Sequence, residues 1–260
     1  MTILITGSKG FIGSNLIPAL KDHTIIEWDR SDGDDIFDDE IDEAVWKSDI
    51  IIHLAADTNV AKSFKEPEET FYNNVVGTAR IAELAVVHRK KLIFPSSAAV
   101  YFPDLSPYAK SKAVAEDIVK GIRGLTDVVI FRFFNIFGPN MNPDSGSLMY
   151  NFLTANDLVV FGDGEQRRDF IHVRDVVDII KESFNDKWND KIIDVGTGQS
   201  YSVNYVAGLF SHYRNMPIKY KPPQREIKWS IANRTMLDML YKKQLRTELN
   251  KDIENLCKAI

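Results

Sequence analysis

Short apolar runs alternate with amphipathic segments through the first half of the sequence, and this alternation constrains the fold more than any other feature. The runs are rich in Ile, Val and Phe, and they lack the polar alternation of half-buried strands. We expect buried strands at residues 2–6, 24–28, 50–54, 91–95 and 128–133, and helices at 11–20, 40–47, 67–88 and 108–121. Strands and helices that alternate at this spacing predict right-handed crossovers and a doubly wound, parallel α/β sheet.

The sequence becomes irregular after Phe137, where a Gly-Pro-Asn triplet opens a segment rich in glycine, proline and asparagine. A further strand at 192–195 ends in Gly-Thr-Gly and is followed by a helix and a Pro-Pro pair. Open α/β sheets bind ligands at the carboxyl ends of their strands, and we expect a smaller lobe to lie over that edge. The expected domains are a sheet domain of residues 1–137 and 168–196, and a C-terminal lobe of residues 138–167 and 197–260.

Composition excludes several classes of protein. The formal net charge of −5 argues against a general nucleic-acid surface. The single cysteine, Cys257, excludes an intrachain disulfide and a cysteine-rich metal cluster, and we expect no metal site. No stretch approaches the ~18 apolar residues of a membrane span, and the N-terminal MTILITG has the pattern of a strand and not of a signal peptide. These features predict a cytoplasmic protein with neither nucleic acid nor membrane as a partner.

A glycine-rich loop follows the first strand. The segment GSKGFIG contains Gly7, Gly10 and Gly13, with Phe11 and Ile12 between the last two. Glycines at this spacing allow a tight turn and a close approach of the backbone to a pyrophosphate, which the helix N-terminus then attracts. Because the loop lies between a strand and an amphipathic helix, it predicts a dinucleotide site on a Rossmann sheet.

Asp29 ends the second strand, 22 residues after Gly7. A carboxylate at this place accepts hydrogen bonds from both ribose hydroxyls of an adenosine and repels a 2′-phosphate, so it favours NAD as the cofactor. The neighbouring Arg30 could instead receive the 2′-phosphate of NADP. An NADPH-consuming reductase therefore stays an alternative.

Two residues of the segment SPYAKSK are candidates for catalysis. Tyr108 and Lys112 are four residues apart and share one helix face. A tyrosine acts as a general base only if its pKa falls from about 10 towards neutrality, and a nearby ammonium favours the phenolate. Upstream, SSAAVY ends a strand and places a serine hydroxyl at the carboxyl edge of the sheet. A binding module without catalysis would not need such a set.

The motifs together resemble the extended short-chain dehydrogenases/reductases, and within them the UDP-glucose 4-epimerase-like nucleotide-sugar epimerases and dehydratases. The resemblance covers residues 1 to about 235. It rests on GSKGFIG, HLAA, NNVVGT, SSAAVY, YAKSK, FRFFNIFGP, GDGEQRRDFIHVRD and DVGTG, in this order along the chain.

The resemblance implies a role for each matching residue. Ser97 binds the reacting sugar oxygen, Tyr108 is the base, and Lys112 holds the nicotinamide ribose and polarises Tyr108. Further cofactor contacts are implied for Asp35, Ile36, Leu54, Ala55, Ala56, Asn74 and Phe134, with Asp35 and Ile36 beside the adenine. The nucleotide diphosphate is implied to bind Asn135, Arg168 and Arg225. For Arg168 the alternative is a salt bridge with Asp169 or Asp175. We interpret His53 and His172 as structural.

The residues after Ser97 bear on the reaction. Related dehydratases carry Asp-Glu there and decarboxylases carry Glu, whereas this chain has Ala98 and Ala99, which transfer no proton. The resemblance therefore implies 4-epimerisation of a UDP-hexose (glucose/galactose or their N-acetyl forms) through a 4-keto sugar, with NAD regenerated. A reductase or dehydratase of the same fold and a non-catalytic dinucleotide-binding module remain alternatives. The resemblance also implies a homodimer.

Overall fold

A six-stranded sheet in the order β2-β1-β3-β4-β5-β9 combines five strands from the first half of the chain with β9 from the second half. The computed structural model describes all of residues 1–260. Its strands are β1 (Thr2–Thr6), β2 (Thr24–Trp28), β3 (Ile50–His53), β4 (Lys91–Ser97), β5 (Val128–Phe133) and β9 (Lys191–Val195). β1 pairs in parallel with β2 and β3, and β3 pairs in parallel with β4. The predicted doubly wound α/β fold is confirmed.

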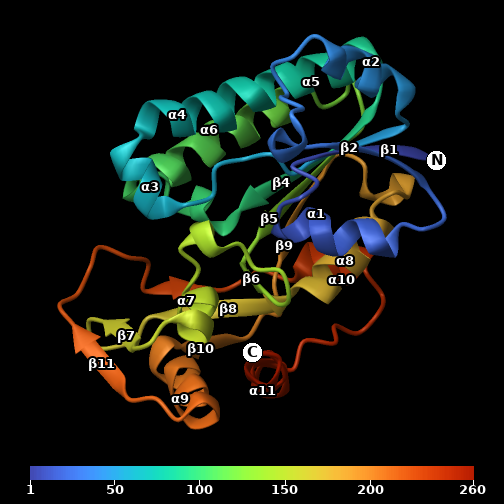
Figure 1. Cartoon of the computed structure of the whole chain (residues 1–260). Coiled ribbons are helices and arrows are strands. Elements are labelled where there is room, and N and C mark those ends of the chain that lie inside the picture. The colour runs from blue at the N-terminus through green and yellow to red at the C-terminus, as the bar shows by residue number, and fades with distance from the viewer. The chain divides into compact units, whose positions relative to one another are not determined.

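The chain divides into two compact units, which are described separately. The first consists of residues 1–132 and 177–193, and the second of residues 133–176 and 194–260. The helices of the first unit are α1 (Phe11–Leu16), α2 (Glu40–Lys47), α3 (Val60–Lys65), α4 (Pro67–Phe71), α5 (Gly77–Val87) and α6 (Pro107–Gly121). Figure 1 shows α5 and α6 side by side over one face of the sheet, with α1 on the other. α8 (Val173–Glu182) contains a boundary between the units.

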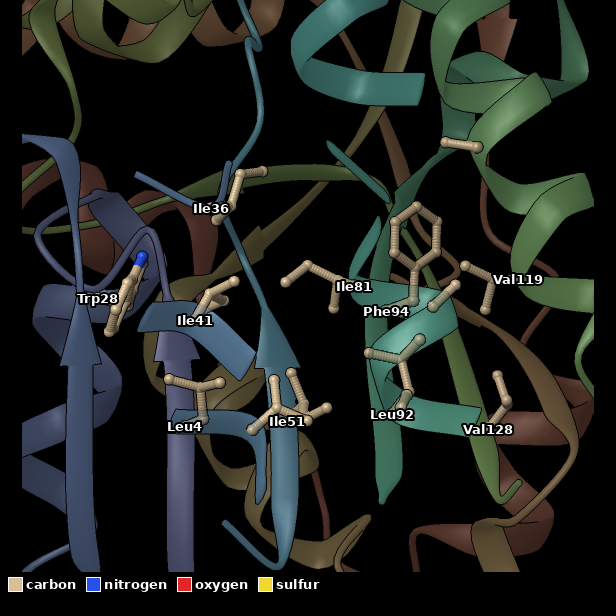
Figure 2. Close-up of a cluster of buried hydrophobic side chains, with 14 of the residues drawn as sticks. Leu4, Trp28, Ile36, Ile41, Ile51, Ile81, Leu92, Phe94, Val119 and Val128 are labelled. Atoms are coloured by element: carbon tan, nitrogen blue, oxygen red, sulfur yellow. The ribbon is translucent and has the colours of Figure 1, made fainter. Parts of the chain in front are cut away.

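The hydrophobic core of the first unit lies between the sheet and these helices. Figure 2 shows strand side chains meeting helix side chains in one cluster. The strands contribute Leu4, Ile51, Leu92, Phe94 and Val128, and the helices contribute Ile41, Ile81 and Val119. These residues belong to the Ile- and Val-rich runs and amphipathic segments of the sequence, so burial explains why the runs lack polar alternation.

The expectation of a buried strand was wrong for β2. Thr24 and Glu27 are exposed, and only Trp28 of this strand is buried. β2 is the edge strand and has β1 as its only neighbour in the sheet. An edge strand is covered less completely than a central one, so apolar residues in its sequence do not guarantee burial.

The expected helix at 67–88 is divided. α4 ends at Phe71, a π-helical turn follows at Tyr72–Val76, and α5 begins at Gly77. Asn73 and Asn74 are buried in this turn. Short π-helical segments inside helices occur frequently at functional sites. The helix expected at 11–20 also changes, becoming a 3-10 helix at Ile17–Ala19.

The second unit contains two small sheets and four helices that lie wholly within it. One sheet joins β10, β8 and β12, with β6 also paired to β8, and the other joins β11 to β7. The strands are β6 (Asn135–Phe137), β7 (Leu158–Phe161), β8 (Arg167–His172), β10 (Ser200–Ser202), β11 (Ile218–Lys221) and β12 (Trp229–Ser230). The helices are α7 (Leu148–Thr154), α9 (Val203–Arg214), α10 (Thr235–Leu240) and α11 (Leu249–Lys258). No helix of the chain is both long enough and apolar enough to cross a membrane.

Candidate functional site

The glycine loop leaves no room for side chains at two of its three glycines. Gly7 has φ +70°, and a Cβ atom there would lie 2.6 Å from the backbone nitrogen of Ala55. A Cβ at Gly13 would lie 2.2 Å from the carbonyl oxygen of Ser8. Both neighbouring atoms are backbone and cannot rotate away, so the close approach of β1, its loop and the end of β3 requires glycine. Gly10 closes the turn by donating its N–H to the Gly7 carbonyl at 3.1 Å.

A cavity of about 230 Å³ opens beside this loop. We call it the loop cavity. Its walls come from the end of β2, from the residues that follow β1, β2 and β3, and from the π-helical turn. They are Gly7, Gly10, Trp28, Asp29, Arg30, Asp34, Ile36, Leu54, Ala55, Ala56, Asp57 and Asn73. Strand order reverses between β1 and β3, and this is the place where doubly wound sheets bind ligands.

Seven of the expected cofactor-site residues line the loop cavity together: Gly7, Gly10, Asp29, Ile36, Leu54, Ala55 and Ala56. Phe11, Ile12 and Gly13 form the first turn of α1. Asn74 does not line the cavity. Its side chain binds the backbone N–H and C=O of Asp57, at 2.7 and 2.9 Å, and so supports the wall. Phe134 lies in the second unit, where it is buried.

The carboxylate of Asp29 is held in a fixed orientation. One oxygen accepts the Lys9 N–H at 2.9 Å, and the other accepts the Ser31 N–H and hydroxyl at 3.0 and 2.8 Å. Burial alone would raise the pKa of Asp29, but the hydrogen bonds from Ser31 and Lys9 outweigh it and leave this pKa below its usual value. Asp29 is therefore ionised at neutral pH.

Besides Arg30, which was considered only for an NADP site, four cavity residues were not predicted as site residues: Trp28, Asp34, Asp57 and Asn73. Asn73 belongs to the quoted motif NNVVGT and Asp57 follows HLAA, so both had a signal in the sequence. Trp28 and Asp34 had none: Trp28 is an apolar residue at the end of β2, and the position of Asp34 depends on how the chain turns after that strand. The predicted Asp35 is not in the cavity wall, and its carboxylate pairs with Arg30 at 2.7 Å.

Ser97 lies close enough to Tyr108 for its hydroxyl to affect the phenol. Ser97 ends β4, and Tyr108 lies in the first turn of α6, which Ser106 caps by accepting the Ala109 N–H at 3.0 Å. Burial raises the pKa of Tyr108, and the hydrogen bond with Ser97 opposes this rise. In the free protein Tyr108 is thus a protonated phenol, and it becomes a base only when a further positive influence favours its phenolate.

Lys112 lies one turn beyond Tyr108 and is buried. Its ammonium donates to the Pro95 carbonyl at 2.7 Å and lies 4.5 Å from the centre of the Phe94 ring. Burial lowers the pKa of Lys112 to about 8, and the charge of Glu116 opposes this shift. At neutral pH Lys112 remains cationic, as support of a phenolate requires.

Glu116 anchors α6. Its carboxylate accepts hydrogen bonds from the Ser96 hydroxyl at 2.6 Å and from Arg132 Nη2 at 2.6 Å, and it pairs with Lys120 at 2.7 Å. Burial would raise the pKa of Glu116, but these partners lower it to about 2. The anionic carboxylate ties α6 to β4 and β5 one turn beyond Lys112, and so fixes the helix that carries both catalytic candidates.

His53 makes hydrogen bonds through both ring nitrogens, to Thr6 at 2.8 Å and to Thr78 at 3.2 Å. Burial, with a smaller contribution from the charge of Lys112, lowers its pKa to about 3. A neutral imidazole with both nitrogens engaged has a structural role here. The His172 ring is also fixed by a hydrogen bond, because its Nδ1 accepts the Arg174 backbone N–H at 3.1 Å.

The second unit contains a separate pocket of about 140 Å³ that brings Asn135 and Arg168 together. We call it the arginine pocket. The remaining lining residues are Leu148, Val159, Phe161, Gln166, Val203, Gln224 and Glu226. Arg225, the third expected phosphate ligand, is exposed and does not line it.

Arg168 forms a salt bridge with Glu226 at 3.0 Å. The alternative partners, Asp169 and Asp175, were the wrong carboxylates. Arg168 and Asp169 are successive residues of β8, so their side chains point to opposite faces. Asp169 instead accepts the N–H groups of Thr197 and Gly198 at 2.8 Å. Burial lowers the pKa of Arg168, and Glu226 opposes the shift.

The family model for the NAD dependent epimerase/dehydratase family matches residues 3–196. The chain belongs to this family. Its curated relatives include a putative UDP-glucose 4-epimerase of Methanocaldococcus jannaschii, 30% identical over 86% of this chain and 87% of the relative. A UDP-N-acetyl-alpha-D-glucosaminuronate decarboxylase of Bacillus cytotoxicus is also 30% identical, over 78% and 77% of the two chains.

Solved structures of family members have the same fold. The UDP-N-acetylglucosamine 4-epimerase of Methanobrevibacter ruminantium, in complex with UDP-N-acetylmuramic acid, has a TM-score of 0.89 and 26% identity, covering 99% of this chain and 97% of its own. MoeE5, in complex with UDP-glucuronic acid and NAD, has a TM-score of 0.89 and 25% identity, covering 100% and 99%. Epimerases and decarboxylases thus occur among the relatives of this chain.

NAD is the cofactor of the family, and the loop cavity fits it. Gly7 and Gly10 line the cavity without side chains, so a pyrophosphate can approach the backbone there. The ionised Asp29, whose two oxygens are oriented by protein donors, suits a pair of ribose hydroxyls.

Proposed function

We propose that this chain is a UDP-hexose 4-epimerase that holds NAD in its first unit and the nucleotide sugar through its second. The observation that carries the proposal is the set of Ser97 at the end of β4 with Tyr108 and Lys112 on α6, where the buried Lys112 ammonium donates to the Pro95 carbonyl of β4. A non-catalytic binding module has no use for this arrangement.

The residues after Ser97 favour epimerisation over the other reactions of the family. Ala98 and Ala99 begin a 3-10 helix at the end of β4, and neither carries a group that can give or take a proton. A dehydratase or decarboxylase needs an additional acid or base beside the sugar. Without one, the oxidised sugar has only reduction open to it, and reduction on the opposite face inverts the carbon.

The proposed proton path uses two hydroxyl groups. Ser97 donates a hydrogen bond to the reacting sugar oxygen, and the Tyr108 phenolate takes the proton of that hydroxyl as the carbon is oxidised. Lys112 stabilises the phenolate by its charge. Bound NAD supplies the oxidation and the later reduction by accepting a hydride and giving it back. In the return step Tyr108 gives its proton back to the sugar oxygen, so that the protein ends each cycle unchanged.

The cofactor contacts are proposed for the glycine loop, for Asp29 and for the walls of the loop cavity, with Lys112 at the nicotinamide ribose. The substrate contacts are proposed for Asn135 and Arg168, because a guanidinium binds phosphate oxygens with charge assistance. Glu226 holds that guanidinium in the free protein. Arg225 is included on the resemblance alone, and a homodimer likewise remains a prediction.

The test is to incubate the purified protein with UDP-galactose, or with UDP-N-acetylgalactosamine, without added reductant. We expect conversion to the corresponding gluco-sugar, measured by chromatography, and conversion slower by ~10²–10⁴ with the Tyr108→Phe variant. Water loss or carbon dioxide release would instead identify a dehydratase or a decarboxylase. A strict requirement for NADPH would identify a reductase, and binding of NAD without turnover of any UDP-sugar would support a binding module.

A further inference from the structure

Arg30 lies in the wall of the loop cavity beside Asp29. An arginine next to the ribose-binding carboxylate is the residue type that receives the 2′-phosphate of NADP. From its place in the chain alone, Arg30 would weaken any preference for NAD. Its contacts give it a different role.

The guanidinium of Arg30 is held on two sides. Its Nε donates to Asp35 at 2.7 Å, and its Nη2 donates to the side-chain oxygen of Asn73 at 2.8 Å. Asn73 is buried in the π-helical turn, and its amide nitrogen donates to Asp57 at 2.9 Å. Because arginine only donates and an ionised aspartate only accepts, these two partners fix the orientation of the Asn73 amide.

These contacts oppose a phosphate in two ways. Arg30 would have to give up an ion pair and a hydrogen bond in order to turn towards a 2′-phosphate. In addition, the cavity wall contains the carboxylates of Asp29, Asp34 and Asp57, which repel a further negative group. Asp35 neutralises Arg30 locally, so the cavity keeps its acidic character despite the arginine.

We propose that Asp35 and Asn73 determine cofactor choice by restraining Arg30, so that selectivity for NAD depends on this restraint as well as on Asp29. The inference rests on the proposed assignment of the loop cavity to the adenosine end of NAD. It makes Asp35 and Asn73 specificity-determining residues that act through Arg30.

The experiment compares variants that carry the same charge change. Asp29→Ser removes the ribose-binding carboxylate, and Asp35→Asn is added to release Arg30 while an oxygen is kept for the Phe37 N–H that Asp35 accepts at 3.1 Å. The matched control adds Asp34→Asn instead, because Asp34 lines the same cavity while the Arg30 guanidinium is held by Asp35 and Asn73. Calorimetry then measures the dissociation constants of NAD and NADP for each purified variant.

We expect Asp29→Ser/Asp35→Asn to bind NADP at least tenfold more tightly than Asp29→Ser/Asp34→Asn. Adding Arg30→Met to the first pair should abolish this gain. Equal NADP affinities of the two pairs, or a gain that survives Arg30→Met, would overturn the proposal and leave only a general effect of charge. Asp29→Ser/Asn73→Ser releases the other side of Arg30 and should shift NADP affinity in the same direction, which gives a second test if Asp35→Asn does not fold.

The same variants show whether a failure lies in the role of Arg30 or in the assignment of the loop cavity to the adenosine end of NAD. If Asp29→Ser alone leaves NAD affinity unchanged, then the loop cavity is not the adenosine site. If Asp29→Ser weakens NAD but neither release variant improves NADP binding, then the site is correct and the restraint on Arg30 has no effect on selectivity.

Discussion

On its glycine-loop side, the loop cavity is lined by backbone at Gly7 and Gly10. The arginine pocket is lined instead by long side chains such as Gln166, Arg168 and Glu226. In the first unit, chain segments approach so closely that a single Cβ atom would collide with backbone. In the second unit, a salt bridge and an amide contact between residues about 60 positions apart hold the charged groups. The two regions therefore owe their shape to different interactions.

The difference bears on how each region tolerates substitution. A wall of backbone cannot relax around an added atom, so one methyl group in the glycine loop disturbs the whole turn. A wall of paired side chains can lose one partner and keep its backbone, but the remaining charge then changes what the pocket binds. Substitutions in the two units should accordingly change different quantities.

The largest effect is expected for Tyr108→Phe, which separates chemistry from binding in both regions. The change removes one oxygen and keeps the ring, so the turnover number should fall by ~10²–10⁴ while stability and NAD affinity stay nearly unchanged. The rate of UDP-galactose conversion measures the turnover number, and calorimetry measures the affinity for NAD. Turnover at the wild-type rate would remove Tyr108 from the mechanism.

Arg168→Ala tests the arginine pocket. It should weaken binding of a UDP-sugar by roughly 1.5–3 kcal/mol, the scale of a hydrogen bond to a charged group, and leave NAD affinity unchanged. Glu226→Gln is the matched variant, because it removes the competing carboxylate and keeps the guanidinium. We expect it to bind UDP-sugar at least as well as the wild type. Equal losses of UDP-sugar and NAD affinity in Arg168→Ala would show that Arg168 supports the fold.

Gly13→Ala tests the backbone-walled region. The new Cβ atom would lie 2.2 Å from the Ser8 carbonyl oxygen, and overpacking of this kind costs about 1–3 kcal/mol of stability. NAD affinity should fall with it, because the first turn of α1 has to move. Urea unfolding and calorimetry measure both quantities.

The control for this prediction is Gly208→Ala in α9. A Cβ atom at Gly208 meets nothing within 4 Å, and glycine in a helix is less stable than alanine by about 0.5–1 kcal/mol. This variant should therefore be slightly more stable than the wild type and bind NAD normally. A Gly13→Ala variant that behaves like Gly208→Ala would show that the loop is not held by backbone contact.

Lys112→Met should alter the pH dependence of stability. The pKa of Lys112 is about 8 in the folded protein against 10.5 for the exposed group, because burial disfavours the ammonium. Between these two pH values the unfolded chain binds more protons than the folded one, so the free energy of unfolding of the wild type rises with pH. The slope is at most about 1.4 kcal/mol per pH unit.

Below pH 8 the burial penalty is fully present, and above pH 10.5 it is gone. Lys112→Met should lack the rise, as measured by urea unfolding at several pH values from 7 to 10. It should also lose activity and NAD affinity. The same slope in both proteins would mean that another group titrates in this range.

The central strands could be predicted because each is a continuous apolar run, and burial on both faces leaves no other pattern. β2 could not be predicted as exposed, since its position at the edge depends on which strands lie next to β1. The helix at 67–88 has the right period, but a π-helical turn interrupts it. Within that turn Asn74 binds both Asp57 and Ser111, a contact across 37 residues that no local pattern records.

The sequence by itself determined the glycine loop, the acid after β2 and the Tyr-Lys pair, because each depends on spacing within one turn, one strand or one helix. The alternation of apolar runs and amphipathic segments determined the fold class. The tertiary structure decided which carboxylate each arginine meets. Arg168 pairs with Glu226 instead of the adjacent Asp169, and Arg30 is held by Asp35 together with the distant Asn73. Neighbouring residues of a strand point to opposite faces, so charges that are adjacent in sequence separate, and partners meet only when distant segments pack.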